Sequence, residues 1–87
     1  MDSVWLVEEE YSKQYSDGTH VCGAFENEEL AKKALRKIIA TRKKNFKNSF
    51  ERLRHIKNAY TCVDEDGFKE RHYFTIRKYS LNHIFIS

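Results

Sequence analysis

The sequence predicts a single small α+β domain, residues 1–87, in the order ββαββ, with an antiparallel sheet covered on one face by a long or broken central helix. Three observations support this fold class. The 87 residues are 40% apolar and 33% charged, which suits one core and leaves too little chain for a second. Two alternating, aromatic-rich segments flank one amphipathic segment. Neither a proline nor a Gly/Ser-rich linker marks a domain boundary.

The N-terminal segment has the composition of a β-hairpin. Residues 4–7 (VWLV) are β-branched and aromatic, and their alternation continues through Glu9 and Tyr11, as expected of a strand. Residues 16–18 (SDG) are typical of a tight turn in which Gly18 takes a positive φ. Residues 20–25 would then form the return strand.

A helix is expected to begin at Asn27, whose side chain can cap the first turn. Glu28 and Glu29 follow at the positive end of the helix dipole. At about 100° per residue, the apolar residues of this segment fall in one arc and the basic residues in the opposite arc. The apolar arc consists of Leu30, Ala31, Ala34, Leu35, Ile38 and Ile39.

Beyond residue 41 the apolar pattern drifts, and Arg42 intrudes into it. Asn48, followed three residues later by Glu51, could cap a second short helix. An unbroken helix to residue 58 would be about 45 Å long at roughly 1.5 Å per residue, which is long for so small a domain. The sequence therefore favours a central helix broken into two segments.

Residues 59–63 and 68–79 predict a second hairpin around the turn at residues 64–67 (DEDG). The long return strand has aromatic residues on both faces, so one face is expected to pack on the helix while the other stays partly apolar. Residues 83–87 are too apolar for an idle tail and would form an edge strand or dock in a groove. A homodimer through residues 84–86, or through the uncovered sheet face, is an open alternative.

Charge is unevenly distributed along the chain, although its net value is only +3. Residues 1–31 hold eight acidic side chains against Lys13 alone, residues 32–57 hold eleven basic ones against Glu51 alone, and residues 58–87 balance four against four. This asymmetry indicates either an acidic partner or an internal contact between the acidic and basic segments. The candidate partner-binding residues are the basic ones at helical spacing: Lys32, Lys33, Arg36, Lys37, Lys43, Lys44 and Lys47.

No catalytic or metal-binding motif is recognised, so the sequence predicts no enzyme, no cofactor and no metal. Four residues could nevertheless converge across a sheet as a zinc site: His20, Cys22, Cys62 and His72. Their spacing is not that of a compact zinc knuckle, and cysteines in strands are usually buried as small apolar residues. Nothing around either thiol indicates a lowered pKa, which disfavours a Cys/His catalytic pair.

The acidic and aromatic residues give weaker signals. Residues 8–10 (EEE) are interpreted as a polar strand edge, and residues 64–67 lack the remaining ligand positions of a calcium loop. Seven aromatic residues could stack on nucleic-acid bases, although most are expected in the core. These are Trp5, Tyr11, Tyr15, Tyr60, Phe68, Tyr73 and Tyr79.

A hairpin followed by residues 24–35 (AFENEELAKKAL), and then by a closing strand with residues 74–76 (FTI) and Tyr79, resembles small hairpin–helix–hairpin accessory proteins of bacteriophage and prophage genomes. The likeness is one of pattern and spans most of the chain, while residues 41–58 depart from the simplest versions. The resemblance implies a non-enzymatic accessory role, such as anti-defence or anti-CRISPR-like inhibition in the host cell cytoplasm. It transfers no functional residue.

We therefore expect a non-enzymatic binding protein that docks its basic helix face on an acidic protein surface or a nucleic-acid-containing complex. Direct nucleic-acid binding by the same residues is the alternative. No apolar run approaches the roughly 18 residues needed to cross a bilayer, and the chain start has no signal-peptide pattern. Two cysteines 40 residues apart suit free thiols in a reducing compartment. The expected location is cytoplasmic, with no membrane partner.

Overall fold

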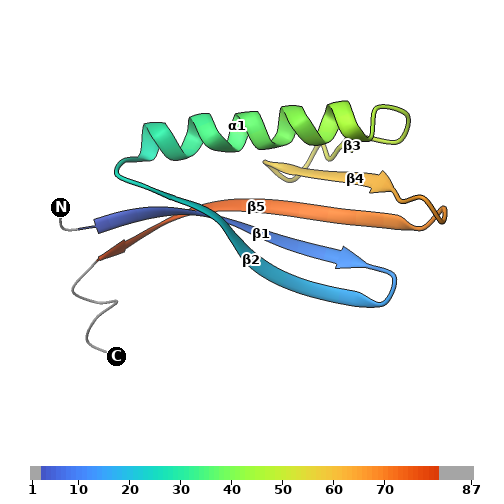
Figure 1. Ribbon diagram of the computed structural model, residues 1–87, viewed down its shortest axis with the longest axis horizontal. Helices are drawn as coiled ribbons and strands as arrows, with labels where there is room; N and C mark the ends of the chain where they lie inside the picture. The colour runs from blue at the N-terminus through green and yellow to red at the C-terminus, as the bar shows by residue number, and fades with distance from the viewer. Residues whose placement is uncertain (1–2, 81–87) are drawn as a thin grey trace.

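The computed structural model describes residues 3–80, which form one antiparallel sheet and one helix (Figure 1). The elements are β1 (Ser3–Lys13), β2 (Ser16–Phe25), α1 (Glu28–Asn45), β3 (Glu51–Arg52), β4 (Ala59–Val63) and β5 (Lys69–Ser80). The strands lie in the order β2-β1-β5-β4-β3. The predicted α+β class and antiparallel sheet are confirmed. The predicted order ββαββ is incomplete, because the short strand β3 follows the helix and makes the sheet five-stranded.

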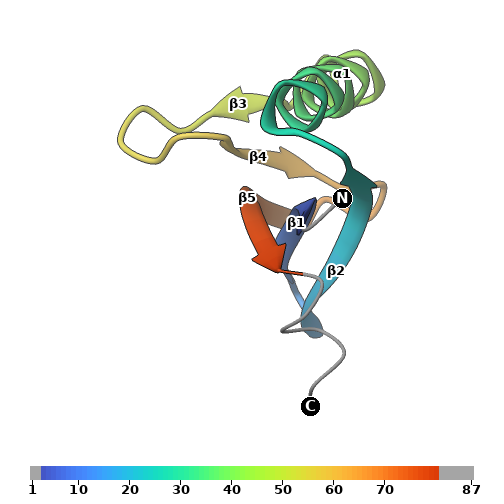
Figure 2. The same cartoon turned by 90° about the vertical axis from the view of Figure 1, so that its left-hand side faces the viewer.

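The N-terminal strand β1 lies inside the sheet and organises the core. It pairs with β2 on one side and with β5 on the other. Helix α1 lies across one face of this strongly twisted sheet, and no element described in residues 3–80 covers the opposite face (Figure 2). Because alternate strand residues face the helix, the core joins side chains from both layers. Its buried members include Val7, Leu35, Ile39, Tyr60 and Phe74.

The first hairpin turns earlier than the sequence predicts. Gln14 and Tyr15 form the turn, and β2 begins directly after them, so Gly18 lies inside a strand opposite Tyr11. The Tyr11 ring packs where a β-carbon on Gly18 would lie. The positive-φ turn role predicted for Gly18 is therefore wrong: this glycine makes room for a cross-strand aromatic ring.

Helix α1 begins where the sequence predicts. The Asn27 side chain accepts a hydrogen bond from the Leu30 amide at 2.9 Å, and Glu28 and Glu29 occupy the first turn. The helix then continues without a break to Asn45. Its buried residues follow the predicted apolar arc: Ala31, Leu35 and Ile39.

Replacing Asn27 with alanine is expected to lower the free energy of unfolding by about 1 kcal/mol, because the Leu30 amide would lose its acceptor at the exposed helix end. Urea denaturation of the purified protein measures this change. The matched control is Asn27→Ser, which keeps a capping oxygen and should stay close to wild type. Equal losses in both variants would show that the cap does not stabilise the helix.

The predicted second short helix does not form. After α1 the chain turns at residues 46–49 and enters β3, which pairs with β4, so Asn48 caps no helix. Phe50 stacks on Tyr60 with ring centroids 4.7 Å apart, and Phe46 also packs on the core. Phe46 and Phe50 are four residues apart, as on one face of a helix, but here their rings close the end of the core. The backbone N–H and C=O groups of β3 form hydrogen bonds with the edge of β4. They therefore do not need the internal hydrogen bonds of a second helix.

The second hairpin is confirmed, with β4 and β5 joined through the predicted turn. The Asp64 side chain accepts hydrogen bonds from the amides of Asp66 and Phe68, each at 2.9 Å. Gly67 has a φ of 86°, which residues with a β-carbon rarely adopt. The apolar segment at residues 83–87, expected to form an edge strand or to dock in a groove, lies outside the described residues, and so does the alternative dimer contact at residues 84–86.

Candidate functional site

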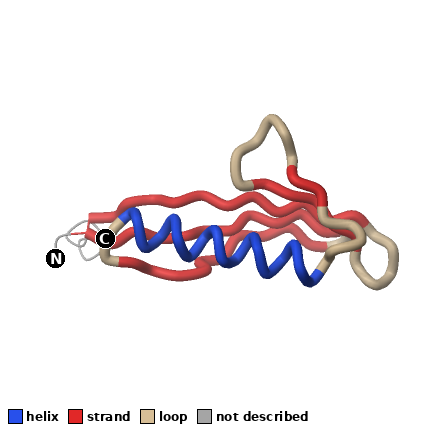
Figure 3. Tube along the Cα trace, turned by 90° about the horizontal axis from the view of Figure 1, so that it is seen from above, coloured by secondary structure: helices blue, strands red, loops and turns tan. Residues whose placement is uncertain are grey.

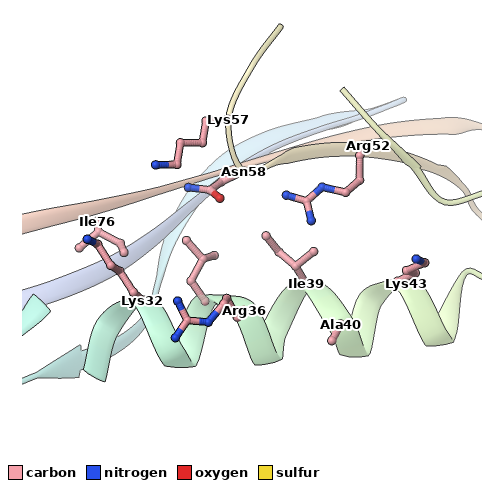
Figure 4. A pocket seen from close by; sticks show the side chains of 10 residues that line it. Lys32, Arg36, Ile39, Ala40, Lys43, Arg52, Lys57, Asn58 and Ile76 are labelled. Atoms are coloured by element: carbon pink, nitrogen blue, oxygen red, sulfur yellow. The ribbon is translucent and has the colours of Figure 1, made fainter. Parts of the chain in front are cut away.

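A groove lies between helix α1 and the segment that connects β3 to β4. Figure 4 shows its two walls: Lys32, Arg36 and Lys43 extend from the helix, and Arg52 and Lys57 lie opposite them. The second wall exists because the β3–β4 connection extends sideways from the sheet (Figure 3). The groove encloses about 540 Å³. Between the walls, its apolar lining consists of Leu35, Ile39, Ala40 and Ile76.

Positive charge in this groove is largely unneutralised. Five of its ten lining residues are basic and none is acidic. Lys32 forms an ion pair of 2.8 Å with Glu28, one turn earlier on the helix, but both side chains are nearly half exposed, so water and salt screen the pair. The other four basic residues form no ion pair within residues 3–80. The groove is therefore suited to a negatively charged ligand.

The structure does not place the seven predicted partner-binding residues on one surface. They lie on two faces of helix α1 and in the turn that follows it. Lys32, Arg36 and Lys43 line the groove, together with Arg52 and Lys57 from the opposite wall. The remaining four are exposed but lie outside the groove: Lys33, Lys37, Lys44 and Lys47. The opposite wall was missed because the sequence placed that segment on a second helix. The sequence signal that could have identified Arg52 and Lys57 is their position in the strongly basic segment of residues 32–57.

Away from the groove, an ion pair with a buried carboxylate and a partly buried guanidinium links the inner strand β1 to helix α1. Glu9 of β1 is 1% exposed, and the Arg42 guanidinium donates to both of its carboxylate oxygens at 2.8 and 3.1 Å. Arg42 also donates to the Tyr60 hydroxyl at 2.6 Å, and His72 Nδ1 lies 2.7 Å from the Glu9 carboxylate. The predicted polar edge is therefore wrong for Glu9, because β1 is an inner strand and its pleat turns this side chain toward the helix.

The ion pair keeps Glu9 ionised. Burial by itself raises the pKa of Glu9, but hydrogen bonds from His72 and Arg42, together with the positive charge of Arg42, outweigh burial and lower the pKa from 4.5 to about 2. The same hydrogen bond to Glu9 raises the pKa of Arg42. Burial raises the pKa of Tyr60 to about 12. One contact between the acidic and basic segments thus lies inside the protein, and it uses Arg42 rather than the exposed lysines.

The polar cluster extends from Glu9 across the sheet. His72 Nε2 lies 2.9 Å from Glu70 Oε1, and His20 Nε2 approaches Glu9 Oε1 at 3.1 Å. The sheet therefore separates the four residues considered for a zinc site into two sets, each completed by a glutamate. In each set the potential ligand atoms lie within 4.8 Å of one another: Glu9, His20 and Cys22 form one, and Cys62, Glu70 and His72 form the other. Sequence reasoning missed Glu9 and Glu70 as potential ligands. Spacing along the chain does not show that they lie beside a histidine and a cysteine on the same face of the sheet.

Neither thiol is activated as a nucleophile. Burial raises the pKa of Cys62 to about 11, with a further contribution from the nearby charge of Glu70. Burial also raises the pKa of Cys22, and the charge of Glu9 adds to this effect. Because the thiolate is the reactive form, the two cysteines do not favour a Cys/His catalytic pair.

The aromatic residues considered for base stacking are dispersed. Tyr60 is buried in the core, whereas Tyr15 and Phe68 are exposed at the ends of hairpins. Tyr11 shares the helix-facing side of the sheet with Glu9, and Tyr73 has the opposite parity to His72 and so faces the other side. The partly buried members are Trp5, Tyr11, Tyr73 and Tyr79. This distribution does not assemble one stacking platform from the seven residues.

No protein-family model, curated protein or solved structure matches the chain. Within residues 3–80, no helix has both the length and the apolar character required to span a membrane.

Proposed function

We propose that this protein is a non-enzymatic binding protein whose basic groove docks an acidic, partly apolar protein segment. The observation that carries the proposal is the composition of the groove, in which five basic residues surround an apolar floor and no carboxylate is present. Basic residues steer an acidic partner and fix its orientation. The floor can bury an apolar side chain of the partner, and such buried contacts supply most of the affinity in protein interfaces.

The positions of the basic residues indicate the pattern that a partner would carry. Arg36 and Lys43 are two turns apart on the same side of helix α1, which corresponds to about 10 Å. An extended segment covers about 10 Å with three residues. Because successive side chains of an extended segment point to opposite faces, we expect acidic residues two or four positions apart in the docked segment, where they share a face, and an apolar residue directed at the floor near Ile39.

Nucleic-acid binding is the second candidate, and one observation favours it. Basic residues continue beyond the groove onto the outer face of the helix at Lys33, Lys37 and Lys44. A polyanion would use this outer face as well as the groove, because each phosphate contacted adds to its affinity. The apolar floor favours the protein partner, since a phosphate backbone has no apolar group to bury there.

Docking of this kind suits an inhibitor that occupies a functional surface of a larger protein. The resemblance to small phage accessory proteins implies such a role. We therefore include inhibition of host defence machinery, in the cytoplasm of the host cell, in the proposal.

A yeast-displayed library of random peptides, selected for binding to the purified protein, tests the proposed docking. We expect the selected peptides to combine glutamate or aspartate with leucine, isoleucine or phenylalanine. The double variant Arg36→Glu/Lys43→Glu should weaken their binding at least about tenfold, because it reverses charge on the groove wall. The matched control Lys33→Glu/Lys37→Glu makes the same change in net charge on the outer face and should weaken binding much less. Fluorescence anisotropy measures both effects.

Labelled single-stranded and duplex DNA and RNA form the second arm of the experiment. Tight binding that falls with salt at a log–log slope of about −0.9 per phosphate contacted on duplex DNA, and that weakens equally in both double variants, would favour the nucleic-acid candidate. Selected peptides that lack acidic residues, or that bind the groove variant as tightly as wild type, would contradict docking in the groove.

A further inference from the structure

Three potential metal ligands converge on the helix-facing side of the second hairpin, away from the basic groove. Cys62 of β4 is paired directly with Glu70 of β5, and His72 follows two residues later on the same face. His72 Nε2 and Cys62 Sγ lie 2.9 and 3.9 Å from Glu70 Oε1, and all three potential ligand atoms lie within 4.8 Å of one another. In a tetrahedral zinc site, ligand atoms about 2.0 to 2.3 Å from the metal are about 3.3 to 3.8 Å apart. The observed separations need only small side-chain adjustments to reach that geometry.

The surroundings fix the orientation of the imidazole. His72 Nδ1 lies 2.7 Å from the Glu9 carboxylate, to which Arg42 donates two hydrogen bonds. The Tyr60 ring stacks on the imidazole with centroids 4.8 Å apart. A histidine that binds a metal usually donates its other ring N–H to a carboxylate in this way. The arrangement directs Nε2 toward Glu70 and Cys62.

Charge balance indicates a dication rather than a monovalent ion. Glu9 is compensated by Arg42, whereas Glu70 is buried and has no lysine or arginine within ion-pair distance in residues 3–80. A bound Zn²⁺ would displace the thiol proton and the proton of the hydrogen bond between His72 Nε2 and Glu70. The carboxylate and thiolate together would then balance its two positive charges. A nitrogen, sulfur and oxygen ligand set suits Zn²⁺ and excludes the hard cations Mg²⁺ and Ca²⁺, which require oxygen ligands.

We propose that Cys62, Glu70 and His72 bind one Zn²⁺ ion and leave its fourth position open. Glu70 and His72 line a second cavity of about 430 Å³, which reaches the surface beside Lys13 and His20, so an ion and a fourth ligand have a route to the site. The alternative set is disfavoured because the Arg42 guanidinium already occupies both oxygens of Glu9. This site is separate from the basic groove, and its existence does not depend on the docking proposed there.

Titration of the reduced full-length protein with Co²⁺, followed by absorption spectroscopy, tests the site. We expect one equivalent of Co²⁺ to produce a thiolate-to-cobalt charge-transfer band and intense visible bands typical of tetrahedral coordination, and Zn²⁺ to bleach both. The absence of a thiolate band in the folded wild-type protein would overturn the proposal.

Two matched cysteine variants assign the ligand. Cys62→Ser should abolish the charge-transfer band, and the control Cys22→Ser should retain it. The reverse result would place the metal at the other set and would overturn the proposal. Circular dichroism verifies that both variants are folded.

A third variant keeps the test decisive if Cys62→Ser does not fold. Glu70→Gln retains an oxygen that can accept a hydrogen bond from His72, so we expect it to fold and to bind Zn²⁺ at least about tenfold more weakly in competition with a chelating dye. Unchanged affinity would overturn the assignment. The groove variant Arg36→Glu/Lys43→Glu should bind Zn²⁺ as tightly as wild type, which separates this result from the docking experiment.

Discussion

Replacing Glu9 with glutamine is expected to lower the free energy of unfolding by about 3 kcal/mol, the lower end of the range for a buried ion pair, because the Arg42 side chain is 26% exposed. In the wild-type protein, Arg42 and His72 both form hydrogen bonds with the Glu9 carboxylate. The substitution removes this buried negative charge and leaves Arg42 and His72 in place. Removing Glu9 is costly because the Arg42 charge stays partly desolvated and loses the carboxylate that compensates it. The expected loss is a large fraction of the stability of a domain of this size, which is about 5 to 15 kcal/mol. Urea denaturation followed by circular dichroism measures it.

The matched control for this substitution is Glu10→Gln on the same strand. Glu10 is exposed and forms no ion pair within residues 3–80, so its substitution should change stability by less than about 0.5 kcal/mol. A double-mutant cycle with Arg42→Gln should show strong coupling to Glu9, because the two side chains share two hydrogen bonds. A loss of less than about 1 kcal/mol in Glu9→Gln would show that the pair does not stabilise the fold.

Acidification is expected to remove about 3 kcal/mol of stability as the pH falls from about 4.5 toward about 2. The pKa of Glu9 is lower in the folded state than in the unfolded chain, where it is close to 4.5. The unfolded chain therefore binds the proton first, and acid shifts the equilibrium toward unfolding. Above the unfolded pKa both states are ionised at this position, and the contribution is fully present. Urea denaturation at a series of pH values measures the change.

Glu9→Gln provides the control for the acid effect, because glutamine does not titrate. The groups that face Glu9 are Cys22, His20, Arg42 and His72. Their contributions remain in the variant, so the difference between the wild-type and variant pH profiles isolates the carboxylate. Parallel profiles below about pH 4.5 would show that Glu9 does not have a lowered pKa in the folded protein.

Much of the fold could be predicted because its signals are local. The alternation of residues 4–7, the cap at Asn27 and the Asp64 turn each act through neighbours within a few residues. The second helix was predicted wrongly for the same reason. Phe46 and Phe50 have helical spacing, but they pack on Tyr60 and the sheet core, which no local pattern reveals.

The candidate sites were less accessible to sequence reasoning. Three of the groove residues lie on one amphipathic helix face, where basic spacing identified Lys32, Arg36 and Lys43. The opposite wall depends on strand β3 and the connection that follows it. Arg42 was visible only as a basic residue that interrupts an apolar arc, and its partner Glu9 lies in a run of three glutamates that the sequence does not distinguish.

By itself, the sequence determined the hairpin–helix–hairpin order, the start of the helix and the segregation of charge, because these depend on residues close together in the chain. Tertiary structure alone decided which glutamate of residues 8–10 is buried, which basic residues share a groove, and which histidine and carboxylate each cysteine meets. The Glu9–His72 contact joins residues 63 positions apart. Such contacts depend on which strands pair and in which register, and a shift of one residue would reverse the face of every side chain on a strand.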